Sequence, residues 1–358
     1  MSSEFKTKKK DSTLAKREAE NLSSDTSSII AKFPKNCLIE LTNACNHACI
    51  FCTNPRQVRK IGRLDYQMFE RFITDAVPLG LEEVGLYSTG EPFITKDIDK
   101  YVSFCKENGV KYVYITTNGA LATEEKIKKC IDAGLNSIKF SVNAGTRETY
   151  KLIHGRDDFE KVVDIIRFTH QYREKNNISD LKIYASCVVT RFTEDEKENL
   201  EKEILAFVDQ MAFYDVSPQA GQTLKYFDAM SLSKDAEDSY EPGPCAMLWN
   251  KIHLTREGYL SLCCIDYENS LTYADLNKES LKDAWNNTVI QEMRKRHQTQ
   301  DLEGTLCHNC LYKEDKPVFP LTDIGREQDD LKNEVAFNKP KGVKNLMTTI
   351  DKLEESKK

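Results

Sequence analysis

Three cysteines, Cys45, Cys49 and Cys52, lie close together directly after a short apolar run. Three thiolates at this spacing can bind three irons of a [4Fe–4S] cube and leave the fourth iron open for another ligand. The alternative is a zinc site completed by Cys37 or His47. Structural zinc sites prefer four ligands and paired, repeated cysteine spacings, so the pattern favours an iron–sulfur site.

A second cysteine group lies near the C-terminal end, and its candidate ligands are Cys245, Cys263, Cys307 and Cys310. Four thiolates suit a second iron–sulfur cluster or a closed zinc site, and spacing alone leaves both open. Neighbouring residues of a strand point to opposite faces, so Cys263 and Cys264 cannot both face one cluster there. We choose Cys263 by its spacing and expect Cys264 to pack, with Asp266 as a nearby polar contact.

The composition narrows the class of protein. The chain has 358 residues with 12 cysteines and a net charge of −6, and an acidic protein is a poor partner for nucleic acid or a membrane surface. No signal peptide or membrane span is evident, so we predict a cytoplasmic protein whose thiols stay reduced. Four isolated cysteines in apolar segments are predicted to be core residues: Cys37, Cys105, Cys130 and Cys187.

The spacing of apolar residues predicts the strands and helices that would position these cysteines. Short apolar strands alternate with amphipathic helices, which predicts β-α units and a parallel sheet. The expected strands are residues 37–41, 84–87, 112–116, 137–140, 182–189 and 213–216, and the expected helices are 66–76, 98–108, 124–133, 159–175 and 196–211. Six such units suit an open or closed barrel, although spacing does not separate that from a doubly wound sheet.

Small polar residues and glycines follow four of the expected strands, at residues 42–45, 88–92, 117–119 and 141–145. Parallel α/β proteins place their active sites at this edge of the sheet. Each segment alone is also ordinary turn chemistry. Four in succession indicate a site.

The chain divides by composition. We predict a mobile polar arm at 1–33, an α/β domain at 34–217, a linker at 218–244, a cluster domain at 245–313 and a polar tail at 314–358. Residues 251–255 and 259–263 predict a hairpin, and 281–297 predicts a helix. The tail is predicted to be partly helical near 343–355.

The run from Cys45 to Cys52 (CNHACIFC) resembles the radical S-adenosylmethionine (SAM) signature, and residues 88–92 (STGEP) resemble that superfamily's second motif. The resemblance covers residues 36–217. It implies a partial (β/α)6 barrel within an α/β fold and SAM bound to the open iron. Gly90 and Glu91 would hold the methionine end, Phe51 would lie beside the adenine, and Ser141 and Asn143 would contact the ribose or carboxylate.

The second group resembles the superfamily's auxiliary-cluster domains, the SPASM domain with seven cysteines and the shorter twitch domain with four. Its intervals are similar to those of 2-deoxy-scyllo-inosamine dehydrogenase, although this chain is longer. The resemblance implies a small α+β domain and two [4Fe–4S] clusters in all. A fully ligated second cluster leaves no open iron for substrate, so it would accept or relay electrons.

These features predict SAM-dependent dehydrogenation of a polar small molecule such as a sugar or aminocyclitol, with a flavodoxin or ferredoxin as electron donor. Candidates for the base are Arg191, Tyr184 and Asp266, although each also suits an ordinary structural role. One alternative is a maturase that oxidises or crosslinks a ribosomal peptide. A non-catalytic metal scaffold is the other, and the Gly90-Glu91-Pro92 turn argues against it because a scaffold has no need of SAM.

Overall fold

The computed structural model describes residues 3–7, 13–232 and 243–325. In these ranges the strands are β1 (Ser3–Thr7), β2 (Asn36–Ile39), β3 (Glu83–Gly85), β4 (Tyr112–Thr117), β5 (Ser137–Ser141), β6 (Lys182–Val189), β7 (Gln210–Asp215), β8 (Lys251–Leu254), β9 (Tyr259–Ser261) and β10 (Thr272–Asp275). The α-helices are α1 (Thr13–Leu22), α2 (Tyr66–Leu79), α3 (Ile98–Glu107), α4 (Glu124–Asp132), α5 (Arg147–His154), α6 (Phe159–Lys175), α7 (Lys197–Ile204), α8 (Leu224–Met230), α9 (Met247–Asn250), α10 (Leu281–Ala284), α11 (Thr288–Thr299) and α12 (Leu306–Tyr312). Single 3-10 turns, η1 to η4, occupy Asn54–Arg56, Pro92–Ile94, Glu194–Glu196 and Leu205–Phe207.

One sheet runs through the molecule in the order β1-β7-β6-β5-β4-β3-β2-β8-β9-β10. Strands β2 to β7 are mutually parallel, which confirms the predicted α/β fold with a parallel sheet. Strand β8 pairs in parallel with β2, and β9 and β10 continue antiparallel. The C-terminal region therefore extends the same sheet, beside the strand that precedes the first cysteines.

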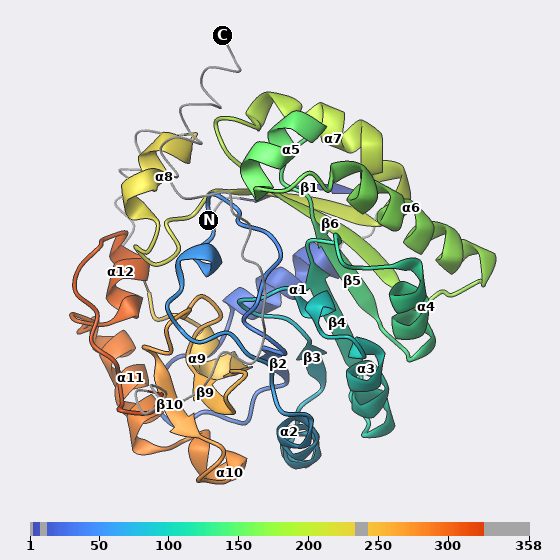
Figure 1. The fold of residues 1–358 in the computed structure, drawn as a ribbon. Coiled ribbons are helices and arrows are strands. Elements are labelled where there is room, and N and C mark those ends of the chain that lie inside the picture. Colours follow the sequence, from blue (N-terminus) through green and yellow to red (C-terminus); the bar gives the residue numbers. More distant parts are fainter. Residues whose placement is uncertain (1–2, 8–12, 233–242, 326–358) are drawn as a thin grey trace.

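The two faces of the sheet have different neighbours. In β4, Val113 and Ile115 are fully buried, whereas the alternating residues Tyr112 and Tyr114 are half-buried on the other face. Helices α3, α4 and α6 cover one face (Figure 1). Helix α1 lies against the opposite, inner face, where Arg17 stacks over the rings of Tyr112 and Tyr114 at 3.8 and 5.0 Å.

Local signals explain where the helices begin and end. Asp65 accepts a hydrogen bond from Met68 N at 3.0 Å and caps the start of α2. Gly80 ends α2 in the left-handed region, at a φ of 119°. Because β2 to β7 are parallel, their C-terminal ends and the loops after them meet on one edge of the sheet.

The expected helix at 196–211 is too long. Helix α7 ends at Ile204, a 3-10 turn follows, and β7 begins at Gln210, three residues before the predicted start at 213. Neither Gly nor Pro marks the helix end. Apolar residues continue through the turn, so hydrophobicity alone did not locate the boundary.

The segment predicted as a mobile polar arm, residues 1–33, contains a strand and a helix in the part that the structure describes. Residues Ser3–Thr7 form β1 and pair antiparallel with β7, and Thr13–Leu22 form α1. The following segment is held by Trp249 Nε1, which donates to Ser28 O at 2.6 Å, and by Arg294 NH1, which donates to Ile29 O at 3.0 Å. These partners are more than 200 residues away in sequence, so local composition cannot reveal them.

Three predictions for the C-terminal part of the chain differ from the structure or concern residues outside the described ranges. The hairpin of β8 and β9 is confirmed, but the expected helix at 281–297 is two helices. The break occurs because Asn287 Oδ1 accepts from Val289 N and Ile290 N at 3.1 Å each and starts α11 afresh. The segment at 218–244, expected as a linker, contains α8. The predicted helix at 343–355 lies outside the described residues.

The described helices include none that combines the length and the apolar character needed to cross a bilayer.

Candidate active site

The first three cysteines lie in the loop between β2 and η1, on the edge where the parallel strands end. Ala48 N and Ile50 N donate to His154 O and Ile153 O at 3.0 Å each, which fixes the loop against the end of α5. Burial raises the pKa of the Cys49 thiol, and the neighbouring thiols of Cys52 and Cys45 raise it further. Three neighbouring thiols fit a cluster that keeps one iron open.

The turn at residues 88–92 is packed directly on this loop. Glu91 N donates to Ala44 O at 2.8 Å. A β-carbon on Gly90 would lie 2.2 Å from Thr42 O and 2.5 Å from Ala44 O, so no larger residue fits without moving the cysteine loop. Gly90 therefore brings the two predicted motifs into contact.

The Glu91 carboxylate is buried and organises the ends of β3 and β4. It accepts hydrogen bonds from Thr117 Oγ1 at 2.6 Å, from Asn118 N at 2.8 Å and from Phe93 N at 3.0 Å. Burial raises the pKa of Glu91, and these donors oppose the shift. A carboxylate has about four acceptor positions, so three donors leave room for one more.

The other residues predicted to contact SAM lie in different surroundings. Phe51 is half-buried and lines a cavity of about 450 Å³ together with Cys52 and Tyr267. Ser141 ends β5, half-buried. Asn143 is buried, and its Oδ1 accepts from Val188 N at 2.8 Å. The Asn143 side chain thus braces the ends of β5 and β6.

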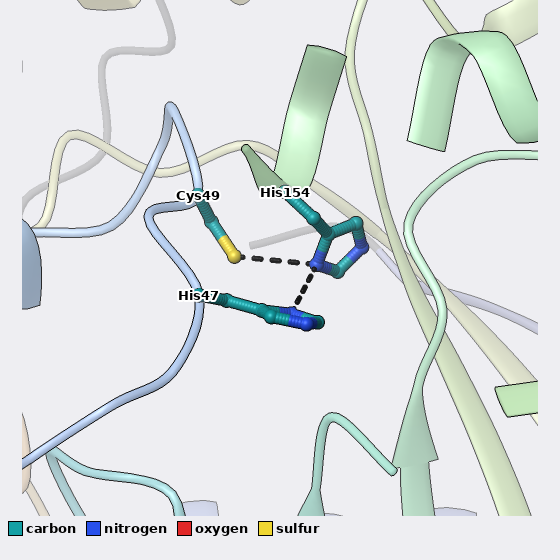
Figure 2. A group of neighbouring side chains, drawn as sticks. All are labelled: His47, Cys49 and His154. Carbon is teal, nitrogen blue, oxygen red and sulfur yellow. Dashed lines mark hydrogen bonds between the residues drawn. The ribbon is translucent and has the colours of Figure 1, made fainter. Parts of the chain in front are cut away.

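Two buried histidines, His154 and His47, lie beside Cys49 (Figure 2). Asn143 N donates to His154 Nε2 at 3.3 Å, so His154 carries its proton on Nδ1. That nitrogen lies 3.3 Å from Cys49 Sγ and 3.2 Å from His47 Nδ1. His47 Nε2 lies 3.1 Å from Asp158 Oδ2. Burial lowers the pKa of both histidines, and the Nδ1 proton of a neutral His154 faces both Cys49 Sγ and His47 Nδ1.

This contact predicts an effect on reduction potential, because hydrogen bonds to ligating sulfurs raise the potential of a cluster. His154→Phe removes the donor but keeps the ring, which stacks on Tyr150 at 4.0 Å between centroids. We expect a more negative midpoint potential for the first cluster in an electron-paramagnetic-resonance titration. His170→Phe, on α6, is the control. An unchanged potential at full iron content would show that the hydrogen bond has no such role.

His47, Cys49 and His154 also offer three ligand atoms within 4.8 Å of one another, so they could hold a metal ion by themselves. This site would use Cys49 and therefore excludes the iron cluster. Cys37, the other residue considered for a zinc site, lies fully buried in β2, and its pKa is raised by burial and then by Cys105. It is a core residue.

The four predicted cysteines of the second group come together. One apolar cavity is lined by Cys245, Cys263, Cys307 and Cys310, with leucines around them. The residues come from the segment before α9, the turn after β9 and helix α12. This set of soft donors in an apolar setting fits a four-thiolate cluster, and it also fits zinc.

Cys264 lies outside that cavity, although its side chain is hydrogen-bonded to the Cys263 thiol. This hydrogen bond, together with His253 and Lys251, lowers the pKa of Cys264. The residue predicted only to pack therefore sits in a polar setting beside a candidate ligand.

Residues 267–269 join the two cysteine groups, and the sequence did not point to them. Tyr267 OH lies 3.4 Å from Cys52 Sγ, and the Glu268 carboxylate accepts from Val58 N and Arg59 N at 2.8 and 3.0 Å. The buried Arg59 guanidinium donates to Asn269 Oδ1 at 2.6 Å and to Glu40 Oε1 at 2.5 Å. The C-terminal region is thus fixed directly against the first cysteine loop.

None of the three residues named as candidate bases lines the cavity of about 450 Å³ in the described structure. Asp266 is buried and accepts from Ser261 Oγ, Ser270 N and Leu271 N at 2.9, 2.8 and 2.8 Å, so it holds a turn. The Arg191 guanidinium stacks over the Phe192 ring at 5.1 Å. Tyr184 lines a smaller neighbouring cavity.

Comparison with known proteins gives two family matches. The sequence profile of the radical SAM superfamily matches residues 39–205, and that of the SPASM iron–sulfur cluster-binding domain matches residues 245–311. An uncharacterized protein of Methanocaldococcus jannaschii is 31% identical over 199 residues, or 55% of this chain and 60% of that protein. The match spans less than two thirds of that relative.

Two solved structures share the fold. BtrN in complex with AdoMet and 2-DOIA aligns with a TM-score of 0.52 at 16% identity, covering 79% of this chain and 93% of BtrN. SuiB of Streptococcus suis bound to the precursor peptide SuiA aligns with a TM-score of 0.59 at 17% identity, covering 86% of this chain and 77% of SuiB. At these identities the likeness concerns the fold.

Proposed function

Because this chain belongs to the radical SAM superfamily and carries a C-terminal SPASM iron–sulfur domain, we propose that it dehydrogenates a polar small molecule. A sugar or an aminocyclitol is the substrate class. The first [4Fe–4S] cluster would be held by Cys45, Cys49 and Cys52. A single auxiliary [4Fe–4S] cluster would be held by four thiolates, those of Cys245, Cys263, Cys307 and Cys310. The barrel would occupy residues 34–217 and the cluster domain 245–313.

When bound, the first cluster supplies the electron that cleaves SAM to methionine and a 5′-deoxyadenosyl radical, and the second supplies an acceptor for the electron that substrate oxidation releases. The protein's own residues bind and orient the reactants. Gly90 lets the 88–92 turn approach the cysteine loop, and Phe51 offers an aromatic face for the adenine. Ser141 and Asn143 are proposed for the ribose or carboxylate.

Glu91 is proposed to bind the methionine ammonium through its remaining acceptor position. Glu91→Gln removes the charge and turns an amide N–H₂ toward donors such as Asn118 N. Charge-assisted hydrogen bonds contribute about 1.5–3 kcal/mol, so SAM affinity should fall roughly tenfold or more. Equilibrium binding of SAM to the iron-loaded protein measures it, with the exposed Glu107→Gln as control. Wild-type affinity in Glu91→Gln would contradict the assignment.

The observation that carries the proposal is the cavity beside the cysteine loop. Phe51 and Cys52 line one side, and polar residues of the inner sheet face, among them Lys139 and Tyr214, line another. A small polar compound would be held there next to SAM. Conversion of an alcohol to a ketone removes one hydrogen atom, one proton and one electron. A fully ligated auxiliary cluster would accept the electron.

Stoichiometry tests this reading. A dehydrogenase consumes SAM as oxidant, so 5′-deoxyadenosine should match the ketone product one for one, with a flavodoxin or ferredoxin as physiological reductant. Deuterium at the oxidised carbon should appear in the 5′-deoxyadenosine. Far less 5′-deoxyadenosine than product would indicate isomerisation instead. A modified peptide as product would favour the maturase alternative, to which the fold likeness to SuiB also lends support.

A further inference from the structure

Helix α1 presents one face to the inside of the sheet. Leu14, Arg17 and Glu18 are spaced to lie together on a helix. Leu14 packs in a buried cluster with Tyr184 and Ala212 of β6 and β7. Arg17 makes two hydrogen bonds to the Glu83 carboxylate of β3, at 3.0 and 2.8 Å. One helical turn thus contacts strands from both halves of the parallel sheet.

Glu18 reaches the residues that face the cavity. Tyr214 OH of β7 donates a hydrogen bond to Glu18 Oε1, and Lys139 Nζ of β5 lies 3.5 Å from the same oxygen. The Lys139 and Glu18 side chains remain 21% and 26% exposed. All three residues line the cavity of about 450 Å³ that also exposes Phe51 and Cys52. The N-terminal segment therefore supplies a carboxylate to the same cavity as the cysteine loop.

The charges in this cavity indicate what it would hold. Glu18 and Asp215 are acidic and Lys139 is basic, so the lining carries a net negative charge. Carboxylates accept from ammonium and hydroxyl groups, whereas Lys139 donates to a hydroxyl. Ser217 and Gln219 add further hydrogen-bonding groups to the wall. A small polyhydroxyl compound with an amino group matches this set.

We propose that α1 is part of the substrate site and that Glu18 binds the amino group of a small amino-polyol, displacing Lys139 as its partner. This rests on the proposed function, since it specifies the substrate class of the same cavity. Glu18 would be a specificity-determining residue, and Lys139 would turn to a substrate hydroxyl. Helix α1, which lies in the segment predicted as a mobile polar arm, would then contribute to recognition.

The test measures binding without turnover. Calorimetry on the anaerobically reconstituted full chain with SAM compares glucosamine with glucose, and 2-deoxystreptamine with myo-inositol. We expect at least one amine to bind roughly tenfold more tightly than its hydroxyl counterpart, as one charge-assisted hydrogen bond would give. Glu18→Gln should remove that preference. Glu20→Gln, an exposed neighbour on the same helix, should keep it.

Lys139→Met separates loss of recognition from loss of structure. It removes the cation that competes for Glu18 and also the proposed donor to a substrate hydroxyl, so the amine and its hydroxyl counterpart both lose that hydrogen bond. The preference for the amine should therefore be kept or rise, opposite in sign to Glu18→Gln. The proposal is overturned if neither amine is preferred by the wild type, or if both variants lose the amine preference equally. Failure of the proposed function would instead appear as absence of SAM cleavage by the wild-type protein.

Discussion

Replacing Cys45, Cys49 and Cys52 together by alanine should abolish dithionite-dependent formation of 5′-deoxyadenosine. These thiols are the soft donors that the loop gathers, and without them no iron remains to which SAM could bind. The rate should fall by at least about a thousandfold, since catalysis of a difficult bond cleavage is lost outright. Chromatographic quantification of 5′-deoxyadenosine and methionine measures it.

Cys105→Ala is the matched control, because Cys105 is a fully buried core cysteine on α3. It should retain SAM cleavage even if its thermal stability falls. SAM cleavage at the wild-type rate in the triple variant would remove the cysteine loop from the chemistry.

The second large expected effect is on formation of the oxidised product and not on cleavage of SAM. Changing Cys307 and Cys310 to alanine should eliminate the auxiliary cluster and its role as electron acceptor. The variant should still form 5′-deoxyadenosine but yield little oxidised product, a loss of roughly a hundredfold or more, as for removal of a catalytic group. Measuring 5′-deoxyadenosine and the oxidised product in one sample gives the ratio of SAM cleavage to substrate oxidation.

Folding must be checked for that variant, because a metal site can be the source of its domain's stability. Circular dichroism and retention of the first cluster's iron serve as the check. Cys130→Ala is the control, since that thiol is fully buried in the core on α4. A folded variant without the auxiliary cluster that oxidises substrate normally would contradict the dehydrogenation mechanism.

Local sequence patterns predicted the features that depend on residues close together in the chain. Cys45 and Cys52 lie only seven residues apart, and Gly90 lies directly after a strand, so spacing and strand ends located them. The alternation of apolar strands and amphipathic helices gave the parallel sheet. This alternation could not predict that the sheet continues through β8, because the pairing of β2 with β8 joins residues more than 200 positions apart.

The residues that sequence reasoning missed act over long distances. His154 reaches Cys49 from 105 residues away, and Tyr267 reaches Cys52 from 215 residues away. A single histidine or tyrosine in a helix or turn carries no signal of such a contact. His47 is the exception, since it lies within the cysteine run and was considered as a ligand.

The N-terminal helix was not predicted from the sequence, and the reason is physical. Arg17 and Glu18 are charged, and charged residues usually stay in water. Here Glu83 and Tyr214 of the inner sheet face offer partners, so the polar helix packs inside. Polarity in the sequence says nothing about polar partners elsewhere in the fold, so this packing could not be predicted.

Metal content of the anaerobically reconstituted wild-type protein tests the central claim most directly. Two [4Fe–4S] clusters predict about eight irons and about eight acid-labile sulfides per chain. About four irons should remain when the first three cysteines are replaced, and about four when Cys307 and Cys310 are replaced. About four irons with one zinc in the wild type would contradict the second cluster, and zinc without iron would contradict both.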